Sequence, residues 1–189
     1  MPHLALDLSK ASTGFAVWRP GWDAPRYGSW ALGSEFTSTG KAFVNLHRKL
    51  SELMQITGPF ETVTYEEPLL LGPAAGNTSA ETQMLLIGLM AHVESFCAAK
   101  RLRRVQYVNQ SSWRKHFIGS MKRGTKRTDL KALTMQRCRD LGWNPRKDDE
   151  ADALGILDYW THCLKIETPW QKAVLFGGAL AHWAGQRWT

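Results

Sequence analysis

The sequence has few cysteines and no closely spaced cysteine pair. Cys97, Cys138 and Cys163 lie far apart, and none belongs to a CxxC pattern. Disulfide frameworks and structural zinc sites need several cysteines at close spacing, so the sequence argues against both kinds of site. We expect the three side chains to be small apolar core residues in a reducing compartment.

The sequence also lacks a long, uninterrupted apolar segment. No window approaches the roughly 20 apolar residues that a membrane-spanning helix needs. The first residues, from Met1 to Asp7, enter an apolar strand-like run directly, without the basic lead and cleavage site of a signal peptide. We therefore expect a protein that does not enter a membrane and that stays in the cytoplasm.

Acidic residues are in the minority. The 189 residues include 24 Lys and Arg against 17 Asp and Glu, which gives a net charge of +7 and a pI near 9.5. This balance indicates a polyanionic partner, either nucleic acid or an anionic membrane surface. A hydrophobic fraction of 43% and this chain length are ordinary for a single globular domain.

Hydrophobic periodicity predicts strands first and then alternating helices and strands. Alternating apolar and polar residues predict a strand over 4–8, and two further strands over 15–18 and 27–32 complete an antiparallel meander. Strands are also expected over 62–66 and 105–108, and helices over 40–57, 82–100, 129–141 and 148–164. This order predicts an α/β fold with a mixed five-stranded sheet, an antiparallel meander plus parallel strands, flanked by helices.

Four carboxylates fall at related ends of these predicted elements. Asp7 lies within an apolar strand, where a lone charge is costly unless it is paired or bound to a cation. Glu66 ends the next convincing strand. Asp149 and Asp152 lie near the start of the last predicted helix, on the apolar face that should pack on the sheet. We expect the four acids to meet.

Four acids that meet cannot all be ionised without a counter-charge, and a divalent metal ion can supply it. Mg²⁺ prefers oxygen ligands, and two ions roughly 3.5–4 Å apart can hold both the attacking water and the leaving oxygen of a phosphodiester. Ordinary structural roles remain open for each acid. Asp7 could begin a turn, Glu66 and Glu67 could simply follow a strand, and the acids from Asp148 to Glu150 could complement a helix dipole.

A basic segment precedes the last two acids. Between Arg114 and Lys131 the only acid is Asp129. Cations of this kind contact DNA phosphates without reading sequence, although a solvated surface is the alternative. Gly119 and Gly124 predict a loop that becomes ordered on DNA. The candidate DNA-binding residues are Arg114, Lys115, Lys122, Arg123, Lys126, Arg127 and Lys131.

Four segments together resemble the RuvC-type Holliday junction resolvases, especially the divergent phage-like members of the ribonuclease H-like superfamily. The resemblance covers about residues 3–164, and its most specific piece is the Asp-x-x-Asp-Ala-Leu pattern that begins at Asp149. The matching segments are 4–9 with 13–16, 63–68, 113–119 and 147–154.

The resemblance implies a ribonuclease H-like fold and catalytic, metal-binding roles for Asp7, Glu66, Asp149 and Asp152. It also implies two Mg²⁺ or Mn²⁺ ions per active site, and a homodimer that places two sites on one four-way junction in a bacterium or phage-infected host. Lys126 matches a cation near the active site, and Arg114 has a weaker match.

Two of the four assignments involve a choice between neighbours. Glu66 is chosen over Glu67 because it directly follows the apolar strand, and the spacing to Asp152 favours Asp149 over Asp148. We predict a nuclease domain over 1–167. The segment 168–189 should be a partly helical tail that packs on the domain or on a dimer partner, with the aromatic residues Trp170, Phe176, Trp183 and Trp188.

Three other functions remain open. The same metal site could cut an RNA–DNA hybrid or an RNA precursor, because selectivity lies in groove shape. The segment from Asp7 to Gly14 also resembles the phosphate loop of actin-like ATPases and sugar kinases, but those proteins need two lobes and this chain has room for one. A noncatalytic DNA-binding module is the third alternative. We expect no nucleotide cofactor.

Overall fold

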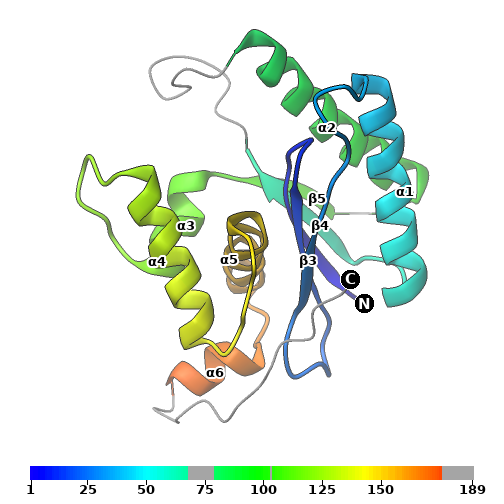
Figure 1. Cartoon of the computed structure of the whole chain (residues 1–189). Helices are drawn as coiled ribbons and strands as arrows, with labels where there is room; N and C mark the ends of the chain where they lie inside the picture. Colours follow the sequence, from blue (N-terminus) through cyan, green and yellow to red (C-terminus); the bar gives the residue numbers. More distant parts are fainter. Residues whose placement is uncertain (68–78, 103, 176–189) are drawn as a thin grey trace.

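The computed structural model describes residues 1–67, 79–102 and 104–175 as an α/β fold around one five-stranded sheet (Figure 1). The strands are β1 (His3–Asp7), β2 (Thr13–Trp18), β3 (Arg26–Trp30), β4 (Thr62–Glu66) and β5 (Arg104–Val108). The helices are α1 (Thr39–Thr57), α2 (Ala80–Ala99), α3 (Gln110–Ile118), α4 (Arg127–Asp140), α5 (Asp148–Cys163) and α6 (Pro169–Leu175).

The sheet is mixed, as predicted. Its strand order is β3-β2-β1-β4-β5. The meander β1-β2-β3 is antiparallel, whereas β4 lies parallel to both β1 and β5. The central position of β1 gives it an antiparallel neighbour on one side and a parallel neighbour on the other, so the end of β1 meets the start of β2 and the end of β4.

Helices cover both faces of the sheet (Figure 1). Helices α1 and α2 pack on one face, where Leu4 and Leu6 join a core with Leu46 and Leu89. Helices α3 to α6 lie on the other face, where Ala5 joins a second core with residues of α5 and α3. Alternate residues of β1 point to opposite faces, so β1 contributes to both cores and is buried along almost its whole length.

Helix α5 is the central element of the second layer. It contacts four strands on one side and α3 and α4 on the other. The sequence predicted one buried stripe, but every residue from Glu150 to Asp158 is buried. Gly155 allows this packing, because a Cβ there would stand 2.7 Å from the Trp113 ring and 3.0 Å from the Phe117 ring. α3 therefore lies directly against α5.

Helix α3 was not predicted. Asn109 caps it by accepting a hydrogen bond from the backbone N–H of Ser111, and Gly119 ends it with φ 85°. The helix is only nine residues long, and Trp113 and Phe117 are its two buried residues. Its presence confines the predicted basic loop to 119–126, because Arg114 and Lys115 belong to α3, while Arg127 and Lys131 belong to α4.

The described part of the aromatic tail packs on the second core. Trp170 of α6 is 4% exposed, and its ring meets those of Trp18 and Trp143 edge-on, with centroids 5.4 Å away in both pairs. Its indole N–H donates to Oδ1 of Asp158 at 2.7 Å. Phe176, Trp183 and Trp188 lie outside the described residues, and the division at residue 167 stays a prediction.

The structure corrects two predictions, one on the burial of the cysteines and one on the length of apolar helices. Cys97 and Cys138 are buried, but Cys163 is exposed because it lies at the outer end of α5. Among the described residues, α2 is also long and apolar enough to cross a membrane, by length and composition alone. An 18-residue window of this 20-residue helix has a mean hydropathy of 1.2, and 22% of that window is buried. Such a helix is weak evidence for a membrane span, since core helices pass the same test.

Candidate functional site

Asp7 and Glu66 end two adjacent parallel strands at the same edge of the sheet. Leu6 of β1 is paired with Tyr65 of β4, and each acid is the next residue of its strand. Both acids line a small cavity of about 70 Å³, together with Leu8, Leu86 and Met90. Parallel pairing therefore accounts for the first half of the site.

The start of α5 supplies the second half. Asp7 is paired across the sheet with Gly14, and a Cβ on Gly14 would overlap the backbone carbonyl of Asp149. This close approach brings the acids of α5 to Asp7. Burial raises the pKa of Asp7 well above its usual value, and Asp152, Glu66 and Asp149 raise it further. The four acids therefore lie close enough to influence one another electrostatically, and their meeting at one metal site stays a prediction.

Helix α3 holds the carboxylate of Glu66. The side-chain amide of Gln110 donates to Oε1 at 2.6 Å, and the indole N–H of Trp113 donates to Oε2 at 2.7 Å. Burial nevertheless raises the pKa of Glu66, against the lowering effects of Arg114 and these two donors. Both oxygens keep a further lone pair, so the carboxylate is oriented and can still bind a cation.

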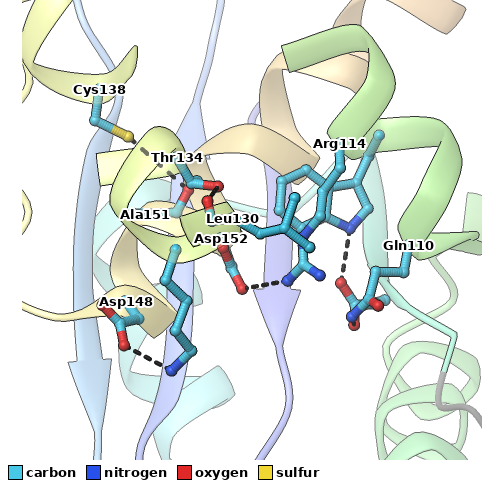
Figure 2. Close-up of polar contacts among 11 residues, drawn as sticks. Gln110, Arg114, Leu130, Thr134, Cys138, Asp148, Ala151 and Asp152 are labelled. Atoms are coloured by element: carbon cyan, nitrogen blue, oxygen red, sulfur yellow. Dashed lines mark hydrogen bonds and ion pairs between the residues drawn. The ribbon is translucent and has the colours of Figure 1, made fainter. Parts of the chain in front are cut away.

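Asp152 is paired with Arg114 of α3 (Figure 2). The guanidinium Nη2 donates to Oδ2 of Asp152 at 2.9 Å. The other oxygen, Oδ1, is buried and has no hydrogen-bond partner in the described part of the chain. Burial raises the pKa of Asp152 to about 6, with a contribution from Glu66, although Arg114 and Lys131 lower it.

The acids beside Asp149 face other groups. Asp148 forms an ion pair with Lys131, with Nζ and Oδ2 2.6 Å apart (Figure 2). Glu150 is fully buried and accepts hydrogen bonds from the hydroxyl of Ser29 and the backbone N–H of Arg146. Asp149 is therefore the member of the acidic run that acts on Asp7, which agrees with the choice made from its spacing to Asp152.

The donor set fits a hard divalent cation. It offers carboxylate oxygens, an unpartnered oxygen on Asp152, and a cavity beside Asp7 and Glu66. However, no three His, Cys, Asp or Glu side chains close around one point within residues 1–67, 79–102 and 104–175. The positive charge inside the cluster belongs to Arg114. The metal-binding roles of the four acids therefore remain predictions.

The predicted cations divide into two groups. Arg114 and Lys131 pair with acids of α5, and Arg127 lowers the pKa of Glu66 through its charge. Lys126, the predicted catalytic cation, is exposed at the start of α4, and no ion pair joins it to a described acid. The exposed remainder of the predicted DNA-binding set is Lys115, Lys122 and Arg123.

Sequence reasoning missed Gln110 and Trp113 and underrated Arg114. These three residues stand at positions i, i+3 and i+4 of α3, so they share the face that meets Glu66 and Asp152. The available signal was Asn109, a good helix-capping residue directly after an apolar strand, followed by this spacing. The spacing predicts that the three side chains share one face of the helix, but it does not predict that this face contacts Glu66 and Asp152.

The fold matches that of two solved Holliday junction resolvases. T. thermophilus RuvC in complex with a Holliday junction substrate superposes with a TM-score of 0.61 and 14% identity, covering 86% of this chain and 96% of that one. The yeast mitochondrial Holliday junction resolvase Ydc2 gives a TM-score of 0.58 and 12% identity, covering 92% of this chain and 80% of that one. No family model and no curated protein matches the sequence. The predicted RuvC-like, ribonuclease H-like fold is confirmed.

Proposed function

We propose that the protein is a divalent-metal-dependent endonuclease that cleaves four-way or other branched DNA junctions. The observation that supports the proposal is that Asp152, Glu66 and Asp149 all raise the pKa of Asp7, in a chain that folds like RuvC. Burial raises the pKa values of Asp7, Glu66 and Asp152, and neighbouring acids add to it for Asp7 and Asp152, so the ionised forms of these acids need added positive charge. A divalent cation meets that need.

The four acids would hold Mg²⁺ or Mn²⁺, two ions in the predicted arrangement. When bound, such ions activate water and stabilise the charge that develops on the scissile phosphate. The chain's own residues prepare this site. Gln110 and Trp113 fix the orientation of Glu66, and the pairing of β1 with β4 fixes the position of Asp7 beside it.

The exposed cations near the site would bind the DNA backbone. Lys115 on α3, Lys122 and Arg123 in the loop, and Lys126 and Arg127 at the start of α4 are all exposed. They belong to the layer that also supplies Arg114 to the acids (Figure 1). Phosphate contacts of this kind position a nucleic acid without reading its sequence, which suits an enzyme that selects the shape of a junction.

A second copy of the chain would complete the enzyme. Helix α2 exposes the large apolar side chains of Met84 and Ile87, although its other face packs on α1. An exposed apolar strip of this kind is a candidate contact between subunits. A symmetric dimer would place two sites on the two strands that a junction resolvase must cut.

Side-by-side digestion tests the proposal. Purified protein with Mg²⁺ is incubated with a four-way junction, a flap, a linear duplex and an RNA–DNA hybrid of matched sequence. We expect nicking of the junction, little cutting of the duplex, and no cutting with EDTA. Asp7→Asn should lose cleavage and still bind the junction. Normal cleavage by Asp7→Asn would refute the site, and preferential cutting of the hybrid would favour the RNA-directed alternative.

A further inference from the structure

Arg114 is the cation that enters the carboxylate cluster. Its ion pair with Asp152 is largely shielded from solvent, because the two side chains are only 12% and 10% exposed. Its charge also lowers the pKa values of Asp7 and Glu66. One guanidinium on α3 therefore acts on carboxylates from β1, β4 and α5.

The ion pair leaves polar atoms on both sides unsatisfied. Nε of Arg114 and Oδ1 of Asp152 are buried, and neither has a hydrogen-bond partner among the described residues. A guanidinium can pair with a carboxylate through two parallel hydrogen bonds, but only one is present here. Arg114 thus neutralises the charge of Asp152 but leaves Oδ1 of that carboxylate without a hydrogen bond among the described residues. A doubly charged ion that binds carboxylate oxygens directly is a stronger partner.

Arg114 also borders open space. It lines a groove of about 410 Å³ together with Gln110, Lys115, Met121 and Leu130. Because the residue borders both the acids and this groove, rotation about its side-chain bonds can carry the guanidinium from one to the other. The exposed amine of Lys115 in the same groove makes it a suitable place for a phosphate.

We propose that Arg114 is an exchangeable counter-ion, which neutralises the carboxylates while no metal is bound and is displaced from Asp152 into the groove when a divalent cation binds. In the groove the guanidinium is available to a DNA phosphate. The metal would then act twice, by completing the site and by releasing a cation for the substrate. This inference rests on the proposed function, because it requires metal binding at these four acids.

Calorimetric titration with Mn²⁺ in the absence of DNA tests the exchange. At about pH 8, above the pKa of about 6 for Asp152, protons compete little with the metal for that carboxylate. Arg114→Met should bind Mn²⁺ about tenfold more tightly than the wild type, because the metal no longer displaces a charge-assisted hydrogen bond. Arg114→Lys keeps a charge and should fall between the two. Lys165→Met removes an exposed charge beyond the far end of α5 from Asp149 and Asp152, and it should leave the Mn²⁺ affinity unchanged.

A second measurement follows the guanidinium itself in the wild-type protein. The ¹⁵N Nε signal of Arg114, assigned by its loss in Arg114→Lys, should move during Mg²⁺ titration with the midpoint of metal binding. The Nε signal of Arg48, on α1, should stay in place. If Arg114→Met does not fold, this titration alone tests whether metal binding displaces Arg114 from Asp152.

The outcomes separate this inference from the proposed function. Unchanged or weaker Mn²⁺ binding by folded Arg114→Met, or an Arg114 signal that does not move at saturating Mg²⁺, overturns the exchange. If the wild type nevertheless binds metal and nicks junctions, the proposed function stands without it. A wild type that binds no divalent metal refutes both.

Discussion

Gly14 of β2 lies in direct contact with the backbone of Asp149, so the sheet and the start of α5 meet without an intervening side chain. This contact sets the distance between Asp7, which is paired with Gly14, and the two acids of α5. The absence of a side chain at position 14 is therefore a requirement of the site as well as of the packing.

Gly14→Ala should damage both stability and metal binding. The added methyl group would overlap the carbonyl of Asp149, which is backbone and cannot rotate away, so α5 must shift. Overpacking of this kind typically costs about 1–3 kcal/mol of the free energy of unfolding. Gly40→Ala is the control, because a Cβ there meets nothing within 4 Å. Urea unfolding and Mn²⁺ titration measure the two effects, and a fully stable Gly14→Ala would contradict the close contact.

Asp7→Asn should stabilise the metal-free protein while it removes activity. The raised pKa of Asp7 means that its ionised form is disfavoured in the folded state, and asparagine has no charge to repel Asp152, Glu66 and Asp149. A gain of about 1 kcal/mol would raise Tm by roughly 2–4 °C. Thermal unfolding in EDTA measures it. A lower Tm for the variant would show that Asp7 is a structural residue rather than a functional one.

Stability without metal should fall as the pH rises through about 6. The pKa of Asp152 is raised from 3.8 to about 6, so the folded protein holds this proton more tightly than the unfolded chain. The resulting stabilisation is complete below the unfolded pKa and is lost as the pH passes the folded one. Thermal unfolding in EDTA from about pH 4 to about pH 8 should show a shallower decline in Asp152→Asn than in the wild type.

Metal should reverse this dependence, because metal ligands must be deprotonated. Mn²⁺ affinity is expected to increase as the pH rises through about 6, the pKa of Asp152. Isothermal titrations at several pH values measure it. A metal affinity that does not change across this range would exclude Asp152 as a ligand.

Trp113→Phe should weaken metal binding through Glu66. The change removes the indole N–H that donates to Oε2 and lets the carboxylate rotate. Loss of a group that orients a ligand typically costs about 10–100-fold in metal affinity. Trp143→Phe controls for the loss of packing, because Trp143 is buried in the same core against Phe117 and Trp170. Equal metal affinities in the two variants would show that the Trp113 donor has no orienting role.

Neutralising the loop cations should weaken junction binding and its salt dependence. Each lost phosphate contact lowers the slope of log K against log salt by about 0.9, so Lys122→Ala with Arg123→Ala should lower it by about 1.8. Lys41→Ala with Arg48→Ala removes the same charge from α1, on the opposite face of the sheet (Figure 1). Filter binding at several salt concentrations compares the pairs. Equal slopes would place the DNA elsewhere.

The sequence predicted the parts of the site that follow from local pattern. Period-2 alternation located the strands, and parallel pairing then placed Asp7 and Glu66 at one edge. Spacing within one helix distinguished Asp149 from Asp148. The strand positions are confirmed because each depends on residues close together in the chain or on a general rule of sheet geometry, whereas the choice of Asp149 as a ligand stays a prediction.

What the sequence did not predict depends on contacts between distant segments. Helix α3 is short and has two buried residues, so its periodicity is weak. Arg114 can pair with Asp152 because Gly155 lets α3 approach α5. No local sequence pattern predicts this approach. Lys126 was chosen by resemblance to a family and stays a prediction, whereas contacts between distant segments let Arg114, Arg127 and Lys131 lower the pKa values of Glu66 or Asp152.

The position of α5 in the chain has a consequence for synthesis on the ribosome. Residues of β1, β2 and β4 emerge early, but α5, which packs on all of them, emerges only after Asp148 has been added. Until then Ala5 and Ala16 lack the cover that Leu154 and Ile156 provide in the finished core. A nascent chain therefore carries Asp7 and Glu66 without Asp149 and Asp152 until α5 has emerged, and the proposed site cannot form before then.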